Sequence, residues 1–346
     1  MRGSRYLMVV AMAAAINCGG KLPGGGGGLG GHDIPNGGAV PGGLGGASGE
    51  VDPNTCGNYA VTDAGRKLHD FLVATKDLEK VTTETVQIVR TSCVTMGHDL
   101  GMTDVDFPTG MEAKDVCAKV WGQIHDNMKV AIKPKAKLTA QYTPAVCKVD
   151  IDAQAKLAAE CEGKASADVG ASCSGVCHGR CDGTCAGKAG TGGNGGECNG
   201  ECKGTCHGSC EGHADVKASA QCRSSAQVHA SANLECTEPK LEISFDAKVI
   251  VDKAKAEMTI KALRNGLPKL LSVKARLEPL QSAVEVWAMA AKELKDMGPT
   301  FVQSFKDQAM CISGQIAGAA NMIGHIQANV SVSVSVSAEA SGSVGG

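Results

Sequence analysis

Aromatic residues and net charge are both scarce in this sequence, and each shortage excludes a class of protein. Phe, Trp and Tyr make up 3% of the 346 residues, so we expect no single large aromatic core. The formal net charge is -2, which lacks the basic excess that attracts nucleic-acid phosphates. We therefore predict no nucleic-acid partner. The length of the chain is sufficient for two or more domains.

Catalytic signatures are missing as well. We find no Ser/His/Asp constellation, phosphate-binding loop or paired-carboxylate motif. The carboxylates Asp150, Asp152, Glu160 and Glu162 recur at strand spacing among other polar residues, which is typical of a solvated face. We predict that the protein is not an enzyme and needs no cofactor.

The N-terminus has the features of an export signal. Arg2 and Arg5 precede an apolar run from Tyr6 to Ile16, which is too short to span a bilayer. We therefore predict that residues 1–17 are a signal peptide. A secretory signal of the ordinary kind would leave the next cysteine free or paired between chains.

Residues 15–19, Ala-Ile-Asn-Cys-Gly, resemble the lipobox of bacterial lipoproteins. The resemblance implies cleavage before Cys18, a lipid on Cys18 and a membrane partner through that lipid. Asn17 stands where the family usually has Gly, Ala or Ser. Because Gly19 is not the aspartate that retains such proteins at the inner membrane, the resemblance implies the outer membrane or the cell surface.

The number of cysteines agrees with a lipid on Cys18. There are 17 cysteines, an odd number that calls for an explanation in an exported chain, and removing Cys18 leaves 16 for disulfides. Residues 19–49 are dominated by glycine, with three prolines, and such a segment behaves as a flexible tether.

Twelve of these cysteines are placed symmetrically about a centre between Thr191 and Gly192. The symmetry predicts one long antiparallel hairpin over residues 147–236, in which disulfides join directly opposed residues. The predicted pairs are Cys147–Cys236, Cys161–Cys222, Cys173–Cys210, Cys177–Cys206, Cys181–Cys202 and Cys185–Cys198.

The residues between these cysteines support a hairpin. Apolar residues fill the odd positions of the first arm and the even positions of the second, the signal of half-buried strands. Near the tip the repeat becomes Cys-x-Gly-x, with glycines placed opposite glycines. Because glycine weakens a strand and packs nothing, we interpret the disulfides as a replacement for side-chain packing.

Helical periodicity flanks the hairpin and predicts an antiparallel bundle. The expected helices cover residues 63–101, 111–128, 253–265, 268–297 and 299–328. Gly266 and Gly298, each close to a proline, are interpreted as breaks between the last three of these helices. Four cysteines remain for two disulfides in this base, with three possible pairings: Cys56, Cys93, Cys117 and Cys311.

Three further segments alternate with period two. Residues 130–142 and 241–251 extend the hairpin in the same symmetric register, while residues 330–344 alternate Val or Ala with Ser and predict a third strand at its edge. The extended register pairs Tyr142 with Leu241 and Leu138 with Phe245.

Together these patterns predict an α+β fold: an antiparallel helical bundle that carries a very long disulfide-laddered antiparallel β-hairpin plus a C-terminal third strand. The predicted segments are 1–17 (signal peptide), 18–55 (lipid-anchored Gly-rich tether), 56–128 (first half of the helical base), 129–252 (long hairpin with the Cys-x-Gly-x tip), 253–328 (second half of the base) and 329–346 (C-terminal strand).

This organisation favours a structural or adhesive protein of the cell envelope that presents a rigid β projection. An uncovered Ala/Val/Gly face of the arm predicts self-association or a protein partner. One alternative is a pore-type protein that inserts the hairpin, although no Phe, Trp or Tyr lies between Cys147 and Cys236 to form an aromatic girdle.

The other alternative is a thiolate metal-binding protein. His178, His207 and His213 lie near the cysteines, but strand alternation places them on the opposite face. An oxidising compartment favours disulfides over metal thiolates, so we predict no metal site.

Overall fold

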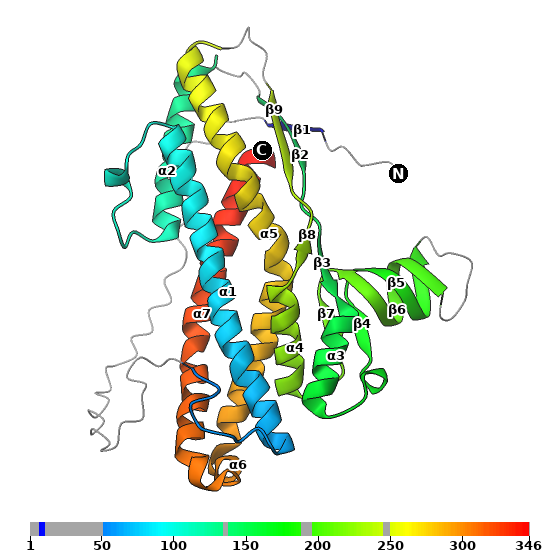
Figure 1. The fold of residues 1–346 in the computed structure, drawn as a ribbon. Helices are drawn as coiled ribbons and strands as arrows, with labels where there is room; N and C mark the ends of the chain where they lie inside the picture. Colours follow the sequence, from blue (N-terminus) through cyan, green and yellow to red (C-terminus); the bar gives the residue numbers. More distant parts are fainter. Residues whose placement is uncertain (1–6, 11–50, 134–137, 188–195, 245–249, 346) are drawn as a thin grey trace, which may run out of the picture.

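The computed structural model describes residues 7–10, 51–133, 138–187, 196–244 and 250–345. The fold is α+β, as predicted, and is dominated by a long helical bundle (Figure 1). Its principal helices are α1 (Asp63–Asp99), α2 (Ala113–Ala131), α4 (Ala220–Ala232), α5 (Lys253–Asp296) and α7 (Ala309–Gly345). The 44-residue α5 is about 66 Å long at 1.5 Å per residue, so it sets the length of the bundle.

Apolar faces of α1, α5 and α7 meet in the core, with α2 packed toward one end and α4 toward the other. Trp287 is fully buried, stacks on Phe71 with ring centroids 6.4 Å apart, and donates its indole N–H to Thr75 at 2.8 Å. Because its one polar atom has a partner, this large side chain is buried without an unpaired donor.

Two disulfides fix the ends of the bundle helices. Cys56–Cys311 joins the segment before α1 to the start of α7, and Cys93–Cys117 joins α1 to α2. This is one of the three pairings that the sequence left open. The turn between α5 and α7 contains the short helices α6 (Gly298–Gln303) and η4 (Lys306–Gln308), while η1 (Asp104–Asp106) follows α1.

The predicted break at Gly266 is wrong, because α5 continues through Gly266 and Pro268. A Cβ at Gly266 would lie 2.2 Å from Met96 Cγ and 2.8 Å from the carbonyl oxygen of Ser92 in α1. The glycine is therefore the point where α5 and α1 approach closely, and it does not end the helix.

The predicted C-terminal strand is also wrong, since residues 330–344 lie within helix α7. Val336 and Ser333 are buried, and the Ser333 hydroxyl donates to the carbonyl oxygen of Asn329 at 3.0 Å. Alternating Val and Ser puts all the valines on one side of a strand, but in a helix it distributes them over opposite sides. The pattern is therefore compatible with a helix that is packed on more than one side. Packing against α5 and α1 therefore overrides the β propensity of valine.

Between α2 and α5 the chain leaves the bundle and returns. Strands β2 (Leu138–Thr143) and β9 (Lys240–Ser244) pair with Tyr142 opposite Leu241, as predicted, while Phe245 lies outside the described residues. β1 (Leu7–Val10), in the predicted signal peptide, pairs with the other edge of β2.

The arms of the predicted hairpin are not continuous strands, and this prediction is wrong for most of residues 147–173 and 214–236. Two helices interrupt the short strands, with α3 in the first arm and α4 in the second. The elements are β3 (Cys147–Asp150), α3 (Ile151–Glu162), η2 (Ser166–Asp168), β4 (Ala171–Cys173), β7 (Ala214–Val216) and β8 (Glu235–Cys236).

Local capping explains why the first arm turns helical. The side chain of Asp150 accepts a hydrogen bond from the backbone N–H of Ala153, and Gly163 ends α3 in the left-handed conformation with φ 66°. The alternating alanines between these caps are good helix formers, so they suit α3 as well as a strand.

Candidate functional surface: the cystine-filled coil

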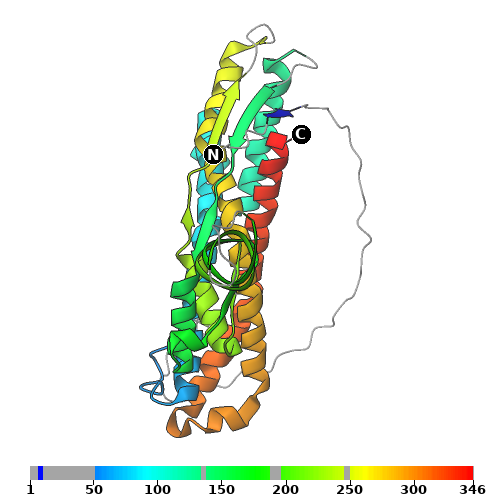
Figure 2. The ribbon, with the colours of Figure 1, turned by 90° about the vertical axis from the view of Figure 1, so that its right-hand side faces the viewer.

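The hairpin at the centre of the cysteine pattern is real, but it is coiled. Its strands are β5 (Val176–Gly187) and β6 (Gly196–Glu211). Cys177 in β5 pairs with Cys210 of β6 on one side and with Gly200 of β6, ten residues earlier, on the other. The two strands therefore wrap around each other into a narrow tube, the cystine coil, which Figure 2 shows end-on as a ring. The coil projects from the flank of the bundle (Figure 1).

Four disulfides fill the inside of the cystine coil. They are Cys173–Cys210, Cys177–Cys206, Cys181–Cys202 and Cys185–Cys198. All of these cysteines are buried except Cys185, which is half-buried beside the tip of the hairpin.

The pairing of these cysteines is as predicted, but the predicted ladder register is wrong. Within the ladder Cys177 lies opposite Cys210, whereas its sulfur bonds to Cys206. The sulfurs meet across the interior of the tube, so they do not join residues that face each other along a flat ladder. The outer pair Cys147–Cys236 does join directly opposed strand residues, and Cys161–Cys222 joins α3 to α4.

The glycines of the repeat share the inner face with the cysteines. A Cβ at Gly183 would lie 2.1 Å from the carbonyl oxygen of Lys203 and 2.9 Å from the Cα of Gly204, its partner in the ladder. At Gly179 the corresponding Cβ would lie 2.1 Å from the carbonyl oxygen of His207. Our interpretation that these glycines pack nothing is therefore wrong, because backbone packs directly on backbone at these positions.

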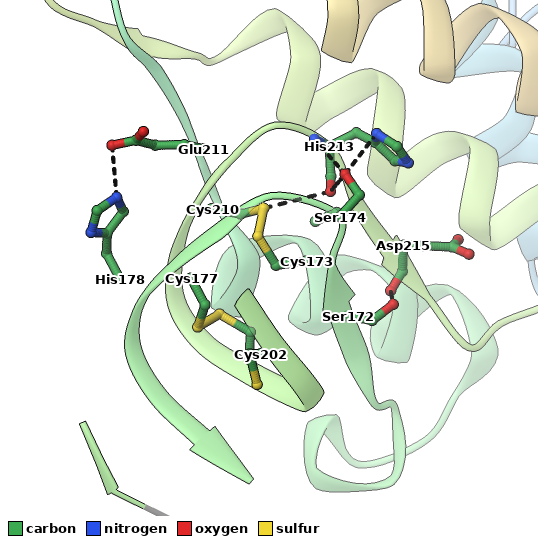
Figure 3. Close-up of a disulfide and its surroundings, with 12 residues drawn as sticks. Ser172, Cys173, Ser174, Cys177, His178, Cys202, Cys210, Glu211, His213 and Asp215 are labelled. Carbon is green, nitrogen blue, oxygen red and sulfur yellow. Dashed lines mark hydrogen bonds and ion pairs between the residues drawn. A yellow bond between two sulfur atoms is a disulfide. The ribbon is translucent and has the colours of Figure 1, made fainter. Parts of the chain in front are cut away.

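The outer face of the cystine coil carries polar and charged side chains that pair with one another. His207 lies between two carboxylates, 3.3 Å from Asp152 of α3 and 3.0 Å from Asp182 of β5. His178 lies 2.7 Å from Glu211 on the neighbouring strand (Figure 3). These histidines lie on the face opposite the sulfurs, as predicted, and they engage carboxylates.

A serine and a histidine also meet where the coil begins (Figure 3). The Ser174 hydroxyl lies 2.8 Å from Nδ1 of His213, and the Ser174 N–H donates to the His213 carbonyl oxygen at 3.0 Å. Within the described residues, no carboxylate contacts the other ring nitrogen of His213, so this contact lacks the third member of a catalytic triad.

A buried carboxylate connects the base of the coil to the bundle. Glu162, at the end of α3, accepts from Lys67 Nζ of α1 at 2.8 Å and from the backbone N–H of Ser219 at 2.6 Å. Burial alone would raise the pKa of Glu162, but the hydrogen bonds from Lys67 and Ser219 outweigh it and lower that pKa to about 2. The carboxylate is thus held ionised between α1 and α4.

A second carboxylate orients the coil relative to α3. Asp152 accepts a hydrogen bond from the backbone N–H of Gly208 in β6 at 2.9 Å. In addition, β3 pairs with the edge of β6, with Lys148 opposite Glu211. The sequence pattern predicted a solvated strand face for both Asp152 and Glu162, and this prediction is wrong, because both lie in helix α3 and the Glu162 side chain is buried. The capping residues of α3 were the signal that could have placed both on a helix.

A polar pocket of about 530 Å³ opens at the base of the coil. Acidic, basic and imidazole side chains line it, including Lys148, Asp150, His178, His229 and Glu235. Its size and its donors and acceptors suit a small polar molecule. Across the described part of the chain, no group of three or more His, Cys, Asp or Glu side chains is arranged to hold a metal ion.

Cys18, the predicted lipidation site, lies outside the described residues. None of the described helices combines the length and the apolarity that a membrane span requires. A scan against protein-family models, a search of curated proteins and a search of solved structures each found no match to this chain.

Proposed function

We propose that this chain is an exported structural or adhesive protein of the cell envelope, tethered by a lipid on Cys18, which displays the cystine coil as a rigid projection. The observation that carries the proposal is the coil itself, four disulfides enclosed in a tube that stands out from the bundle. The eight disulfides indicate an oxidising, extracytoplasmic environment.

Rigidity follows from how the coil covers its own strand edges. Residues 177–181 of β5 have β6 on both sides, and β3 covers part of the remaining edge of β6. Exposed strand edges are the usual sites of aggregation, and the coil leaves few of them open. Its disulfides add stability because they reduce the conformational freedom of the unfolded chain. The coil is thus suited to persist outside the cell as a fixed shape.

The outer face of the coil decides what kind of partner the projection could contact. The Cys and Gly face points inward, so the uncovered apolar face on which we based self-association is not available in the coil. A protein partner would instead meet side chains such as Arg180, Glu201 and Lys203. The same polar exterior argues against insertion of the coil into lipid, which would need an apolar outer band.

Binding by living cells tests the adhesive role. The full chain would be displayed on a bacterial host, and adhesion to surfaces and to purified envelope fractions would be compared with a variant that carries Arg180→Glu and Lys203→Glu. Both changes lie on the outer face, so all eight disulfides should still form. A projection that mediates contact predicts lower adhesion for the variant at equal display, whereas equal adhesion would remove the adhesive role.

Labelling with an alkyne fatty acid tests the tether. Wild-type chain should incorporate the label and partition with membranes, and Cys18→Ser should do neither. Metal analysis of reduced protein and dye release from vesicles test the metal-binding and pore alternatives in the same preparations. Stoichiometric metal or rapid dye release would replace the structural role with one of them.

A further inference from the structure

The tether joins the folded part of the molecule at the end where α6 lies. The described chain resumes at Val51, which is buried against the bundle core, and the backbone N–H of Asp52 donates to Gln315 of α7 at 2.8 Å. Cys56–Cys311 fixes the same segment to the first turn of α7. The described chain therefore resumes beside the start of α7, which lies next to α6 in Figure 1.

This end of the bundle, which we call the α6 end, exposes large apolar side chains. Val61 before α1 is 74% exposed, and Met310 in the first turn of α7 is 71% exposed. Beside Met310 lies an open groove of about 510 Å³ between α5, α6 and α7, lined mainly by apolar residues. The groove residues include Leu294, Lys295, Val302, Met310, Ile316 and Ala317.

We propose that the α6 end rests on the surface of the phospholipid bilayer that holds the N-terminal lipid, with Met310 and the adjoining groove in contact with acyl chains. This inference rests on the proposed lipid on Cys18. Methionine is flexible and polarisable, so it adapts to irregular apolar surroundings. Lys295 beside the groove supplies a cation that can reach anionic headgroups from an apolar stem.

Strand β1 precedes Cys18 and lies at the opposite end of the bundle (Figure 1), and the proposed cleavage before Cys18 removes it. The length of the remaining tether then favours the α6 end over the opposite one. The 33 residues from Cys18 to the start of the described chain at Val51 are rich in glycine, and for a flexible glycine-rich chain of this length we expect an end-to-end distance of about 30 Å. The opposite end lies a further bundle length of about 66 Å away. Val105, which is 89% exposed beyond the C-terminal end of α1, is an apolar residue of that opposite end and would stay out of contact.

Such a placement also defines the direction of the projection. The cystine coil leaves the flank of the bundle between its two ends (Figure 1). With the α6 end on the bilayer, the bundle would hold the coil away from the membrane surface and present its outer face sideways to neighbouring molecules.

Vesicle binding of the full chain that carries Cys18→Ser tests the contact without the lipid. Vesicles of phosphatidylethanolamine and phosphatidylglycerol would be sedimented with this protein, with the same protein carrying Met310→Glu, and with a matched control carrying Val105→Glu. We expect measurable binding that Met310→Glu lowers severalfold and Val105→Glu leaves unchanged. Equal binding of the three proteins, or none by any of them, would overturn the proposal.

Hydrogen exchange of the lipidated protein in the same vesicles separates the two hypotheses. Amides of α6 and the first turns of α7 should exchange more slowly than in a detergent-free sample of the Cys18→Ser protein, while those around Val105 should not change. No fatty-acid label on Cys18 would refute the tether, whereas a labelled protein without this protection would refute only the contact. Concentration-dependent dimers that Met310→Glu disrupts would assign the same surface to a second copy and overturn the proposal.

Discussion

Replacing Gly183 by alanine should prevent the cystine coil from closing, because the added methyl has no space. Its Cβ would lie 2.1 Å from the carbonyl oxygen of Lys203, an overlap of more than 1 Å relative to ordinary contact, and both groups belong to backbone that cannot rotate away. Overpacking a closed interior typically costs 1–3 kcal/mol, and each ladder hydrogen bond that separates costs about 1 kcal/mol more. We therefore expect a loss of about 3 kcal/mol or more in the stability of the coil.

The assay is oxidative refolding from the fully reduced chain, followed by peptide mapping of the disulfides. A loss of about 3 kcal/mol corresponds to a factor of about 150 in the equilibrium between closed and open coil, so native Cys181–Cys202 and Cys185–Cys198 pairs should become minor species in Gly183→Ala. The helical control is Gly122→Ala, where the new Cβ meets nothing within 4 Å and should stabilise α2 by about 1 kcal/mol. Formation of all eight native pairs in Gly183→Ala at the wild-type yield would refute the close-packed coil.

Three more outcomes follow from individual contacts. Because the pKa of Glu162 falls from 4.5 to about 2 on folding, its stabilising contribution should be present above pH 4.5 and lost as the pH falls toward 2. Glu162→Gln should lower the stability at pH 7 and flatten this pH dependence in denaturant titrations. Burial raises the pKa of Tyr59 to about 12, so ultraviolet titration should show one tyrosine that ionises about two pH units above the ordinary value. The free energy of unfolding should fall as the pH rises from 10 to 12, because the unfolded chain loses the phenol proton first. Limited reduction should open Cys185–Cys198 before the three deeper disulfides of the coil, since Cys185 is only half-buried; mass spectrometry of alkylated peptides would show a different first product if the coil were open along its length.

Patterns with large, well-spaced apolar residues predicted their elements correctly. The stripe that includes Leu68, Phe71 and Leu72 became the buried face of α1, and the stripe around Val116 and Val120 became that of α2. Large apolar residues at helical spacing can all be buried only if the segment is a helix, so the periodicity of the sequence predicts the element that the structure has.

Segments of small residues were ambiguous for the same physical reason. Alanine fits a helix and a strand face equally by size, and only the caps at Asp150 and Gly163 distinguish the two in the first arm. The valine and serine run of α7 was decided by its neighbours in the bundle, which a single sequence does not reveal. The polar pocket at the base of the coil was unpredictable as well, since its walls come from β3, α3, β5, β6 and α4.

The disulfide pairs were predicted correctly although the ladder register was wrong, and the coil explains both results. The symmetric spacing of the cysteines shows only which of them are equally far from the tip of the hairpin. Any antiparallel hairpin, flat or coiled, keeps such residues at similar positions along its long axis. In a flat ladder Cys177 and Cys206 would be neighbours across the strands. In the coil the two strands shift by four residues, so that Cys177 lies beside Cys210 while its sulfur crosses the tube to Cys206. On the inner face of a tube this narrow, only glycine fits between successive cysteines. The Cys-x-Gly-x spacing is therefore the feature that distinguishes a coil from a flat ladder.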